Sequence, residues 1–294
     1  MKILITGATG FIGTKLGQVL SQDNQVYGLL RNENSFLEDY FIPVLADLTD
    51  PKFVSLLPEE IDCVIHLAQS LKYRDFPEGV LDINRINVDS TLELLDWSRA
   101  KGVKKFIFAS TANVYGPTEK LLTESCPNNP NSFYGASKLA AENIIKPYAK
   151  FFKIDVLRFF TVYGPGQSGM LIPKITQKIF DGEPIHLAEK EGIYLSPIFI
   201  DDACSIIQTL ISVSSKQQYR LINMCGDEIT TLDKVVTIIE KISGKKGNIR
   251  ITDDKKIFLA GSNSYLKKII GDFHFTTIET GLNVFLKAQS FSAA

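Results

Sequence analysis

Tyr134 and Lys138 have a spacing that could support proton transfer, because they stand four residues apart in a predicted helix and would share one face of it. A phenol with a pKa near 10 is a poor base at pH 7, and a lysine ammonium one turn away stabilises the phenolate and lowers that pKa. Thr111, at the end of a predicted strand, carries a hydroxyl that can hold a reacting oxygen. An isolated pair with this spacing is usually two surface residues of a helix. The catalytic interpretation therefore depends on the other motifs, namely the hydroxyl of Thr111 and a glycine-rich turn.

A glycine-rich turn follows the first strand-like run and opens a helical pattern: Thr6-Gly7-Ala8-Thr9-Gly10-Phe11-Ile12-Gly13. Glycine is needed where the backbone turns tightly, approaches a pyrophosphate or lets a helix touch a strand. The amino end of the helix then offers free N–H donors and partial positive charge to phosphates. The alternative is an ordinary tight turn. With a strand before it and a helix after it, the turn predicts a dinucleotide site made by Gly7, Gly10, Phe11, Ile12 and Gly13.

The end of the second strand-like run, Gly28-Leu29-Leu30-Arg31-Asn32, bears on which dinucleotide binds. An acidic residue at this place bonds the ribose hydroxyls of NAD, whereas an arginine accommodates the 2′-phosphate of NADP. The nearest acid is Glu33, one residue beyond Asn32. We expect NADP(H) or NAD(H) as cofactor, and Arg31 favours NADP(H); the alternative is that Arg31 is a solvated surface residue.

The elements that must position these residues follow an alternating pattern in the first half of the chain. Continuous Val, Ile, Leu and Phe runs are typical of parallel strands covered by helices on both faces, and they lie at residues 2–5, 25–30, 44–46, 63–68, 105–109 and 155–160. Helical patterns lie at 10–20, 82–101 and 135–151. The order predicts the α/β fold class, with a Rossmann-type doubly wound parallel sheet.

The second half of the chain is less regular. After a breaker-rich loop at Tyr163–Gly169, helical patterns at 172–181, 201–212 and 231–243 alternate with short apolar runs. We predict a dinucleotide-binding Rossmann domain at 1–165, with later contributions from about 194–213. Residues 166–294 would form mainly a small mixed α/β C-terminal substrate-binding domain.

Composition excludes several classes of function. Lys and Arg number 32 against 33 Asp and Glu, so the net charge of −1 argues against a nucleic-acid binder or a polybasic membrane anchor. The four cysteines form no C-x-x-C pair and the three histidines lie far apart, so we expect no metal site. No apolar run approaches the ~20 residues that span a bilayer. We therefore expect a cytoplasmic protein with a small-molecule substrate, no nucleic acid and no membrane.

Together these motifs resemble the extended short-chain dehydrogenases/reductases, in the NAD-dependent epimerase/dehydratase family that modifies nucleotide sugars. The resemblance extends over nearly the full length, and it is stronger up to about residue 165. It is carried by Thr6–Gly13, Asp47-Leu48, His66–Gln69, Ile86–Val88, Thr111–Gly116, Tyr134–Lys138, Leu157–Pro165, Ile200–Ala203 and Ile222–Met224.

The resemblance implies a role for each matching position. Thr111, Tyr134 and Lys138 would be catalytic: Tyr134 the acid and base, Lys138 its partner that also holds the nicotinamide ribose, and Thr111 the residue that orients the sugar oxygen. The cofactor would further contact the glycine turn, Arg31, Asp47, Leu48, Leu67, Ala68, Gln69, Asn87, Phe159 and Phe160, and the substrate would contact Thr111, Asn113 and Thr161. The resemblance also implies a homodimer built from the helices at 82–101 and 135–151.

Departures from the family pattern reduce the number of activities that the resemblance implies. Dehydratases need an extra acid and base after the catalytic hydroxyl, and Ala112 and Asn113 cannot titrate there. The arginines that grip a diphosphate in the family are replaced by Leu195 and by the stretch Ile251–Lys256. We predict an NAD(P)-dependent nucleotide-sugar 4-epimerase or 4-ketoreductase, which moves a hydride at the sugar C4 carbon and is not a dehydratase. The alternatives are an NADPH-dependent reductase of a non-nucleotide carbonyl compound and a non-catalytic NADP-binding sensor.

Overall fold

The computed structural model describes residues 1–32 and 39–289, so Glu33 and Ser290–Ala294 lie outside the described residues. The chain divides into two compact units. Unit 1 contains Met1–Gly116, Pro127–Arg158 and Cys204–Ile222, and unit 2 contains Pro117–Cys126, Phe159–Ala203 and Asn223–Ala294. The segment that returns to unit 1 is therefore Cys204–Ile222, whereas the sequence predicted it at about 194–213.

The core of unit 1 is a seven-stranded sheet in the order β11-β6-β5-β4-β1-β2-β3. The pairs β1–β2, β1–β4, β2–β3 and β4–β5 are all parallel. Each strand-like run predicted in the first half forms a strand, which confirms the α/β doubly wound fold class. The strands are β1 (Lys2–Thr6), β2 (Gln25–Leu30), β3 (Ile42–Leu45), β4 (Cys63–His66), β5 (Lys105–Thr111), β6 (Lys153–Phe159) and β11 (Tyr219–Met224).

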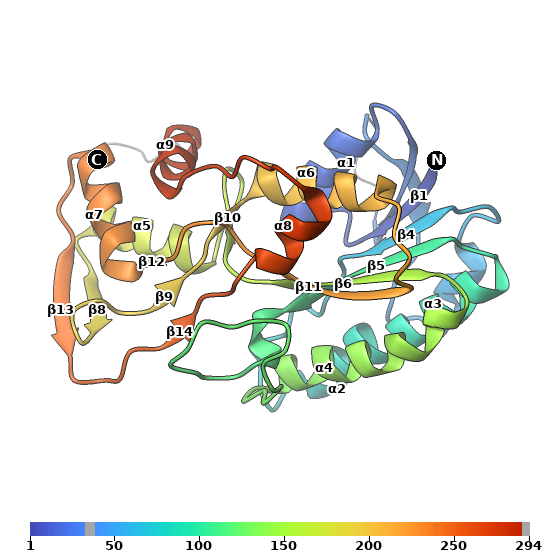
Figure 1. The fold of residues 1–294 in the computed structure, drawn as a ribbon, viewed down its shortest axis with the longest axis horizontal. Helices are drawn as coiled ribbons and strands as arrows, with labels where there is room; N and C mark the ends of the chain where they lie inside the picture. The colour runs from blue at the N-terminus through green and yellow to red at the C-terminus, as the bar shows by residue number, and fades with distance from the viewer. Residues whose placement is uncertain (33–38, 290–294) are drawn as a thin grey trace. The chain divides into compact units, whose positions relative to one another are not determined.

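Helices cover both faces of this sheet. In Figure 1, α1 (Phe11–Leu20) and α6 (Ile200–Ser212) lie on one face, and α3 (Ser90–Ala100) and α4 (Phe133–Ile145) lie on the other. The strand order reverses between β1 and β4, so their carboxyl ends form the switch point where α/β sheets bind ligands. The turns after β1, β4 and β5 all leave the sheet at this edge.

The helical pattern predicted at 82–101 forms three segments in succession. These are α2 (Val80–Asn84), a π-helical turn η3 (Arg85–Asp89) and α3. Asn87, in the middle of the π turn, is fully buried. The pattern predicted at 135–151 forms α4 followed by a 3-10 turn, η5 (Lys146–Lys150).

A buried cluster of charges joins three strands at the far end of the sheet. Asp155 in β6 accepts two hydrogen bonds from Arg220 in β11, at 2.5 and 2.6 Å, and pairs with Lys105 at the start of β5, at 2.9 Å. All three side chains are at most 8% exposed. The sequence did not predict β11, because Arg220 and Asn223 interrupt its apolar run although both are buried.

Unit 2 consists of small sheets and helices. The strand pairs are β7 (Val162–Tyr163) with β10 (Ile198–Phe199), β8 (Pro184–Ala188) with β13 (Asn248–Thr252), and β9 (Tyr194–Leu195) with both β12 (Thr230–Thr231) and β14 (Phe258–Leu259). The helices are α5 (Leu171–Asp181), α7 (Leu232–Ser243), α8 (Ser264–Ile270) and α9 (Ile278–Ala288), together with the first residues of α6. Unit 2 thus contains both helices and strands, and the substrate-binding role predicted for residues 166–294 stays a prediction.

Candidate active site

The glycine turn after β1 leaves no room for side chains. Gly7 has a φ of +72°, and a Cβ on it would lie 2.8 Å from the backbone nitrogen of Ala68. A Cβ on Gly13 would lie 2.1 Å from the carbonyl oxygen of Gly7. Gly10, the residue before α1, makes no side-chain cap, so the first N–H groups of the helix are left to a ligand. This cradle fits the pyrophosphate of a dinucleotide.

The other predicted cofactor residues of unit 1 surround this cradle at the same edge. Leu67, Ala68 and Gln69 directly follow β4, and the backbone of Leu67 bonds Thr6 at the end of β1 (3.2 Å). Asp47 folds back to accept a 2.8 Å hydrogen bond from the backbone of Thr49, and Leu48 is buried. Arg31 is exposed directly beyond β2.

Tyr134 and Thr111 are brought together by the start of α4. Ser132 caps this helix by accepting a 3.1 Å hydrogen bond from the backbone of Gly135. A Cβ on Gly135 would lie 2.7 Å from the carbonyl oxygen of Asn113, so glycine permits a close approach to the end of β5. Thr111 hydrogen-bonds Tyr134, and it also accepts two 3.2 Å hydrogen bonds from Asn113.

Burial sets the electrostatics of Tyr134 and Lys138. Burial raises the pKa of Tyr134, and the hydrogen bond with Thr111 opposes that rise. Lys138 lies one turn further along α4, is 1% exposed and has its ammonium 4.5 Å from the centre of the Phe108 ring. Burial lowers the pKa of Lys138 to about 7, against a smaller opposing effect of Glu142. Burial thus makes the charged form of Lys138 less favourable than it is in water.

Asn87 ties α4, the helix that carries Tyr134 and Lys138, to the loop after β4. Its amide nitrogen donates to Ser137 of α4 at 3.0 Å, and its amide oxygen accepts from the backbone of Ser70 at 3.0 Å. Ser70 is itself buried and donates to Asp82. Both ends of the Asn87 amide are used, so the π turn that carries it holds the loop and the helix in one arrangement.

His66 is the buried centre of a second polar network. Thr91 donates to the carbonyl of Asn87 (2.8 Å), so it accepts from Nε2–H of His66 (3.0 Å). Nδ1 therefore accepts from Thr6 at 2.6 Å. Complete burial lowers the pKa of His66 to about 3, with a further contribution from Lys138. The neutral imidazole thus joins the end of β1 to the helix that carries Asn87.

Acid should therefore destabilise the protein through His66. Its pKa in the folded protein lies below the ordinary 6.5, so the unfolded state binds more protons between about pH 6.5 and pH 3. The free energy of unfolding should fall by about 1.4 kcal/mol per pH unit across this window as the pH is lowered. We expect His66→Gln to flatten this dependence and His186→Gln, at an exposed histidine, to leave it in place. Urea unfolding at a series of pH values measures both slopes; equal slopes in the two variants would contradict the assignment.

Three predicted residues belong to unit 2 and are described there alone. Phe159 and Phe160 are 8% exposed, and the Phe160 ring packs so closely on Gly261 that a Cβ there would lie 2.4 Å away. Thr161 accepts a backbone hydrogen bond from Ile198 at 2.9 Å. Their predicted contacts with cofactor and substrate stay predictions.

The positions where the family carries arginines also belong to unit 2. Leu195 is fully buried in β9. Lys256 lies within 4 Å of the carboxylates of Glu189 and Glu191, so its charge is shared with acids of its own unit.

One aromatic neighbour of the site was missed by the sequence reasoning. Tyr73, in the loop after β4, has its ring centre 5.3 Å from that of Tyr134, and the guanidinium of Arg74 lies 4.9 Å above the Tyr73 ring. The sequence could have indicated Tyr73 by its position in the loop after β4, because loops that follow the strands at the switch point line the edge where α/β sheets bind ligands.

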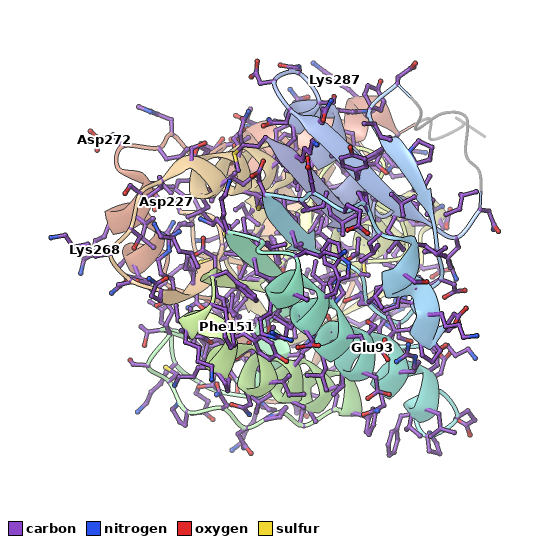
Figure 2. All side chains as sticks on the ribbon, turned by 90° about the vertical axis from the view of Figure 1, so that its right-hand side faces the viewer. Glu93, Phe151, Asp227, Lys268, Asp272 and Lys287 are labelled. Atoms are coloured by element: carbon purple, nitrogen blue, oxygen red, sulfur yellow. The ribbon has the colours of Figure 1, made fainter. Side chains whose placement is uncertain are left out.

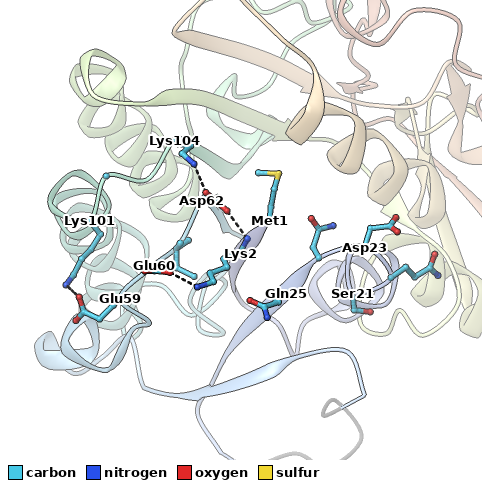
Figure 3. Close-up of a pocket in the computed structure, with 14 residues that line it drawn as sticks. Met1, Lys2, Ser21, Asp23, Gln25, Glu59, Glu60, Asp62, Lys101 and Lys104 are labelled. Atoms are coloured by element: carbon cyan, nitrogen blue, oxygen red, sulfur yellow. Dashed lines mark hydrogen bonds and ion pairs between the residues drawn. The ribbon is translucent and has the colours of Figure 1, made fainter.

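A surface pocket lies at the opposite edge of the sheet (Figure 3). Its lining includes Met1, Lys2 and Gln25, which stand where β1 and β2 begin. Ion pairs cross it, from Lys2 to Glu60 at 2.6 Å and from Lys104 to Asp62 at 2.8 Å. These charged residues therefore pair with one another.

Within residues 1–32 and 39–289, no group of three or more His, Cys, Asp or Glu side chains could hold a metal ion. None of the helices in those ranges has the length and apolar character needed to cross a membrane.

Comparisons with known proteins agree with this geometry. A model of the NAD dependent epimerase/dehydratase family matches residues 3–225. The chain is 30% identical over 274 residues to an uncharacterised UDP-glucose epimerase, YtcB, of Bacillus subtilis (strain 168), covering 86% of this chain and 85% of the relative. It is 30% identical over 303 residues to a GDP-6-deoxy-D-talose 4-dehydrogenase of Aggregatibacter actinomycetemcomitans, covering 98% and 97%. The structure of UDP-glucuronic acid 4-epimerase from Bacillus cereus, in complex with UDP-glucuronic acid and NAD, superimposes with a TM-score of 0.87 at 25% identity over 98% of each chain.

Proposed function

Because the chain belongs to the NAD-dependent epimerase/dehydratase family of short-chain dehydrogenases/reductases, we propose that it inverts the C4 carbon of a UDP-sugar with NAD as its cofactor. The observation that carries the proposal is the meeting of Thr111 and Tyr134 at the switch point, beside the glycine cradle. The relatives support it, since one is named as an uncharacterised UDP-glucose epimerase and one solved structure of a UDP-glucuronic acid 4-epimerase holds UDP-glucuronic acid and NAD. Ala112 and Asn113 support the exclusion of a dehydratase, because neither titrates.

The roles of the residues follow from their positions. Bound NAD supplies the acceptor and donor of a hydride. Tyr134 takes the proton from the C4 hydroxyl as the carbon is oxidised and returns it when the carbon is reduced. Thr111 holds that oxygen, and protonated Lys138 favours the phenolate form of Tyr134. The glycine cradle would hold the pyrophosphate, and Asp47, Leu48, Leu67, Ala68 and Asn87 would border the cofactor.

The cofactor proposed is NAD rather than NADP. The solved relative holds NAD, and the preference for NADP(H) inferred from Arg31 finds no support among the relatives. Arg31 is exposed, as a solvated surface arginine would be. An epimerase also regenerates its cofactor in each turnover and needs no external reductant.

A product assay tests the proposal. Purified protein is incubated with UDP-glucose or UDP-glucuronate without added cofactor, and proton NMR follows the signal at C4. We expect the C4 epimer, no net change in reduced nicotinamide absorbance, and NAD⁺ released when the protein is denatured. Consumption of added NADPH with a 4-keto sugar would instead assign the 4-ketoreductase activity, which the 4-dehydrogenase relative favours.

Calorimetry with UDP separates the remaining alternative. The replacement of the family arginines by residues such as buried Leu195 favours a non-nucleotide carbonyl substrate. We expect UDP to bind nonetheless. A protein that binds neither UDP nor GDP, yet reduces a simple carbonyl compound with NADPH, would be that reductase.

We also propose that the protein forms a homodimer through α3 and α4. These helices pack together in unit 1, and Figure 2 shows Glu93 on α3 and Phe151 just beyond α4. Leu92 and Phe151 are 44% and 51% exposed, and a partner would remove such apolar area from water. Sedimentation should show a dimer, and Leu92→Glu should shift it toward monomer; a wild-type monomer at micromolar concentration would refute the interface.

A further inference from the structure

A closed ring of hydrogen bonds begins and ends on Tyr134. Its phenol hydroxyl donates to Oε1 of Gln69 at 2.7 Å, and the next residue, Ser70, donates from its backbone to Oδ1 of Asn87 at 3.0 Å. Nδ2 of Asn87 donates to Ser137 at 3.0 Å, and Ser137 donates back to the carbonyl of Tyr134 at 2.8 Å. Every donor in this ring has a matching acceptor. The ring therefore fixes both the backbone and the hydroxyl of Tyr134.

The bond from Tyr134 to Gln69 depends on the protonation of the phenol. An amide oxygen can only accept a hydrogen bond, so it pairs with the neutral phenol and not with the phenolate. A hydrogen bond made by the neutral form disfavours ionisation. The amide oxygen of Gln69 also accepts the same bond that a substrate carbonyl would accept from Tyr134.

The anchoring of the loop gives Gln69 its precise placement. Gln69 is itself exposed, but its neighbour Ser70 is fully buried and bonded to both Asn87 and Asp82. Ser70 also accepts from the backbone of Lys72 at 3.0 Å, which turns the loop toward Tyr73. The side chain of Gln69 thus extends from a fixed point of the backbone.

Other groups face Tyr134 from each element of unit 1 that packs against it. Thr111 of β5 hydrogen-bonds it, the Tyr73 ring lies beside it with Arg74 stacked on that ring, and Lys138 stands one turn along α4. Thr111 lowers the pKa of Tyr134, and Tyr73 raises it. Gln69 adds a neutral acceptor to this set, directly on the phenol oxygen.

We propose that Gln69 is a positioning residue, which holds the phenol of Tyr134 protonated in the resting protein and releases it to ionise when the C4 oxygen of the substrate replaces the amide. The proposal rests on the proposed function only in taking Tyr134 as the group that transfers the proton. In the resting protein, the amide oxygen of Gln69 would occupy the position that the substrate oxygen takes when it binds. Binding of substrate then removes the acceptor that favours the neutral phenol, so Tyr134 can lose its proton to solvent and take the proton of the C4 hydroxyl.

The test measures the ionisation of Tyr134 without any sugar. Protein made with tyrosine labelled by carbon-13 at Cζ is loaded with NAD⁺, and the resonance absent from Tyr134→Phe is followed by NMR against pH. Gln69→Ala removes the acceptor, so the midpoint should fall by about half to one pH unit. Gln69→Glu places an acceptor-only carboxylate on the phenol oxygen, so the midpoint should rise.

Gln22 is the matched control, because it is exposed and lines the pocket at the opposite edge of the sheet. Gln22→Ala and Gln22→Glu should leave the midpoint of Tyr134 in place. A midpoint in Gln69→Ala that is not below that of the wild type, or a shift of the same sign in both Gln69 variants, would overturn the proposal; a resonance in Gln69→Ala that fails to titrate below about pH 11 counts as such a result. Because no sugar is present, this readout is unaffected if the protein proves not to be an epimerase.

Discussion

Replacement of Tyr134 by phenylalanine should lower kcat/KM for the sugar substrate by about 10²–10⁴. The substitution removes only the hydroxyl, which in the structure bonds both Gln69 and Thr111. The ring stays beside Tyr73, so the packing of the loop on α4 should be retained. The loss should therefore fall on proton transfer. Steady-state kinetics of the C4 epimerisation, together with calorimetric binding of NAD⁺ and UDP, would separate the lost chemical step from lost binding.

Tyr148→Phe provides the control for this experiment. Tyr148 lies in η5, the 3-10 turn directly after α4, and packs against Phe151 and Phe152. It loses the same hydroxyl group from the same helical segment, and we expect its kcat/KM to match that of the wild type. If Tyr134→Phe kept more than about a tenth of the wild-type rate, general acid–base catalysis would have to be assigned to another residue. Unchanged biological activity of the variant would favour a protein that senses the dinucleotide without catalysis.

The second large effect concerns stability. Asp155→Asn should lower the free energy of unfolding by about 3–5 kcal/mol, because it leaves Lys105 and Arg220 as buried cations without their anion. Urea unfolding followed by circular dichroism measures the change. Asp96→Asn is the matched control, since Asp96 makes an exposed ion pair with Arg99 within one helix. We expect almost no change there.

The same variant also separates stability from catalysis. Lys105 begins β5 and Thr111 ends it, so the charge cluster and the hydroxyl of Thr111 are about 20 Å apart along the strand. Asp155→Asn should thus retain its kcat at temperatures where it is folded. Wild-type stability in Asp155→Asn would mean that water reaches the two cations, and that the cluster is not sealed from solvent.

The parts of the fold that follow from local pattern could be predicted from the sequence. Parallel strands buried on both faces need continuous apolar runs, and the six predicted runs all form strands of the sheet. β11 could not be found in this way, because its Arg220 is buried only through the pairing with Asp155 on another strand. That pairing is a tertiary contact, and the periodicity of the sequence does not indicate it.

The candidate site shows the same limit. Tyr134, Lys138 and the glycine turn are recognisable because their spacing within one segment already implies a shared face or a tight turn. The contacts of Tyr73 and Gln69 with Tyr134 depend on how the loop after β4 is anchored by Ser70 and Asn87. Anchors of that kind join residues distant in the chain, so they become visible only in the folded structure.

The π turn at Arg85–Asp89 has a consequence for how the surrounding sequence is compared. A π turn holds one more residue than an α turn, and one extra residue rotates everything beyond it by about 100° on a regular helical wheel. An alignment with a relative whose helix is regular here would need a one-residue gap inside the helix. Such a gap, which usually marks a loop, would in this chain fall beside Asn87, which donates a hydrogen bond to Ser137 of α4.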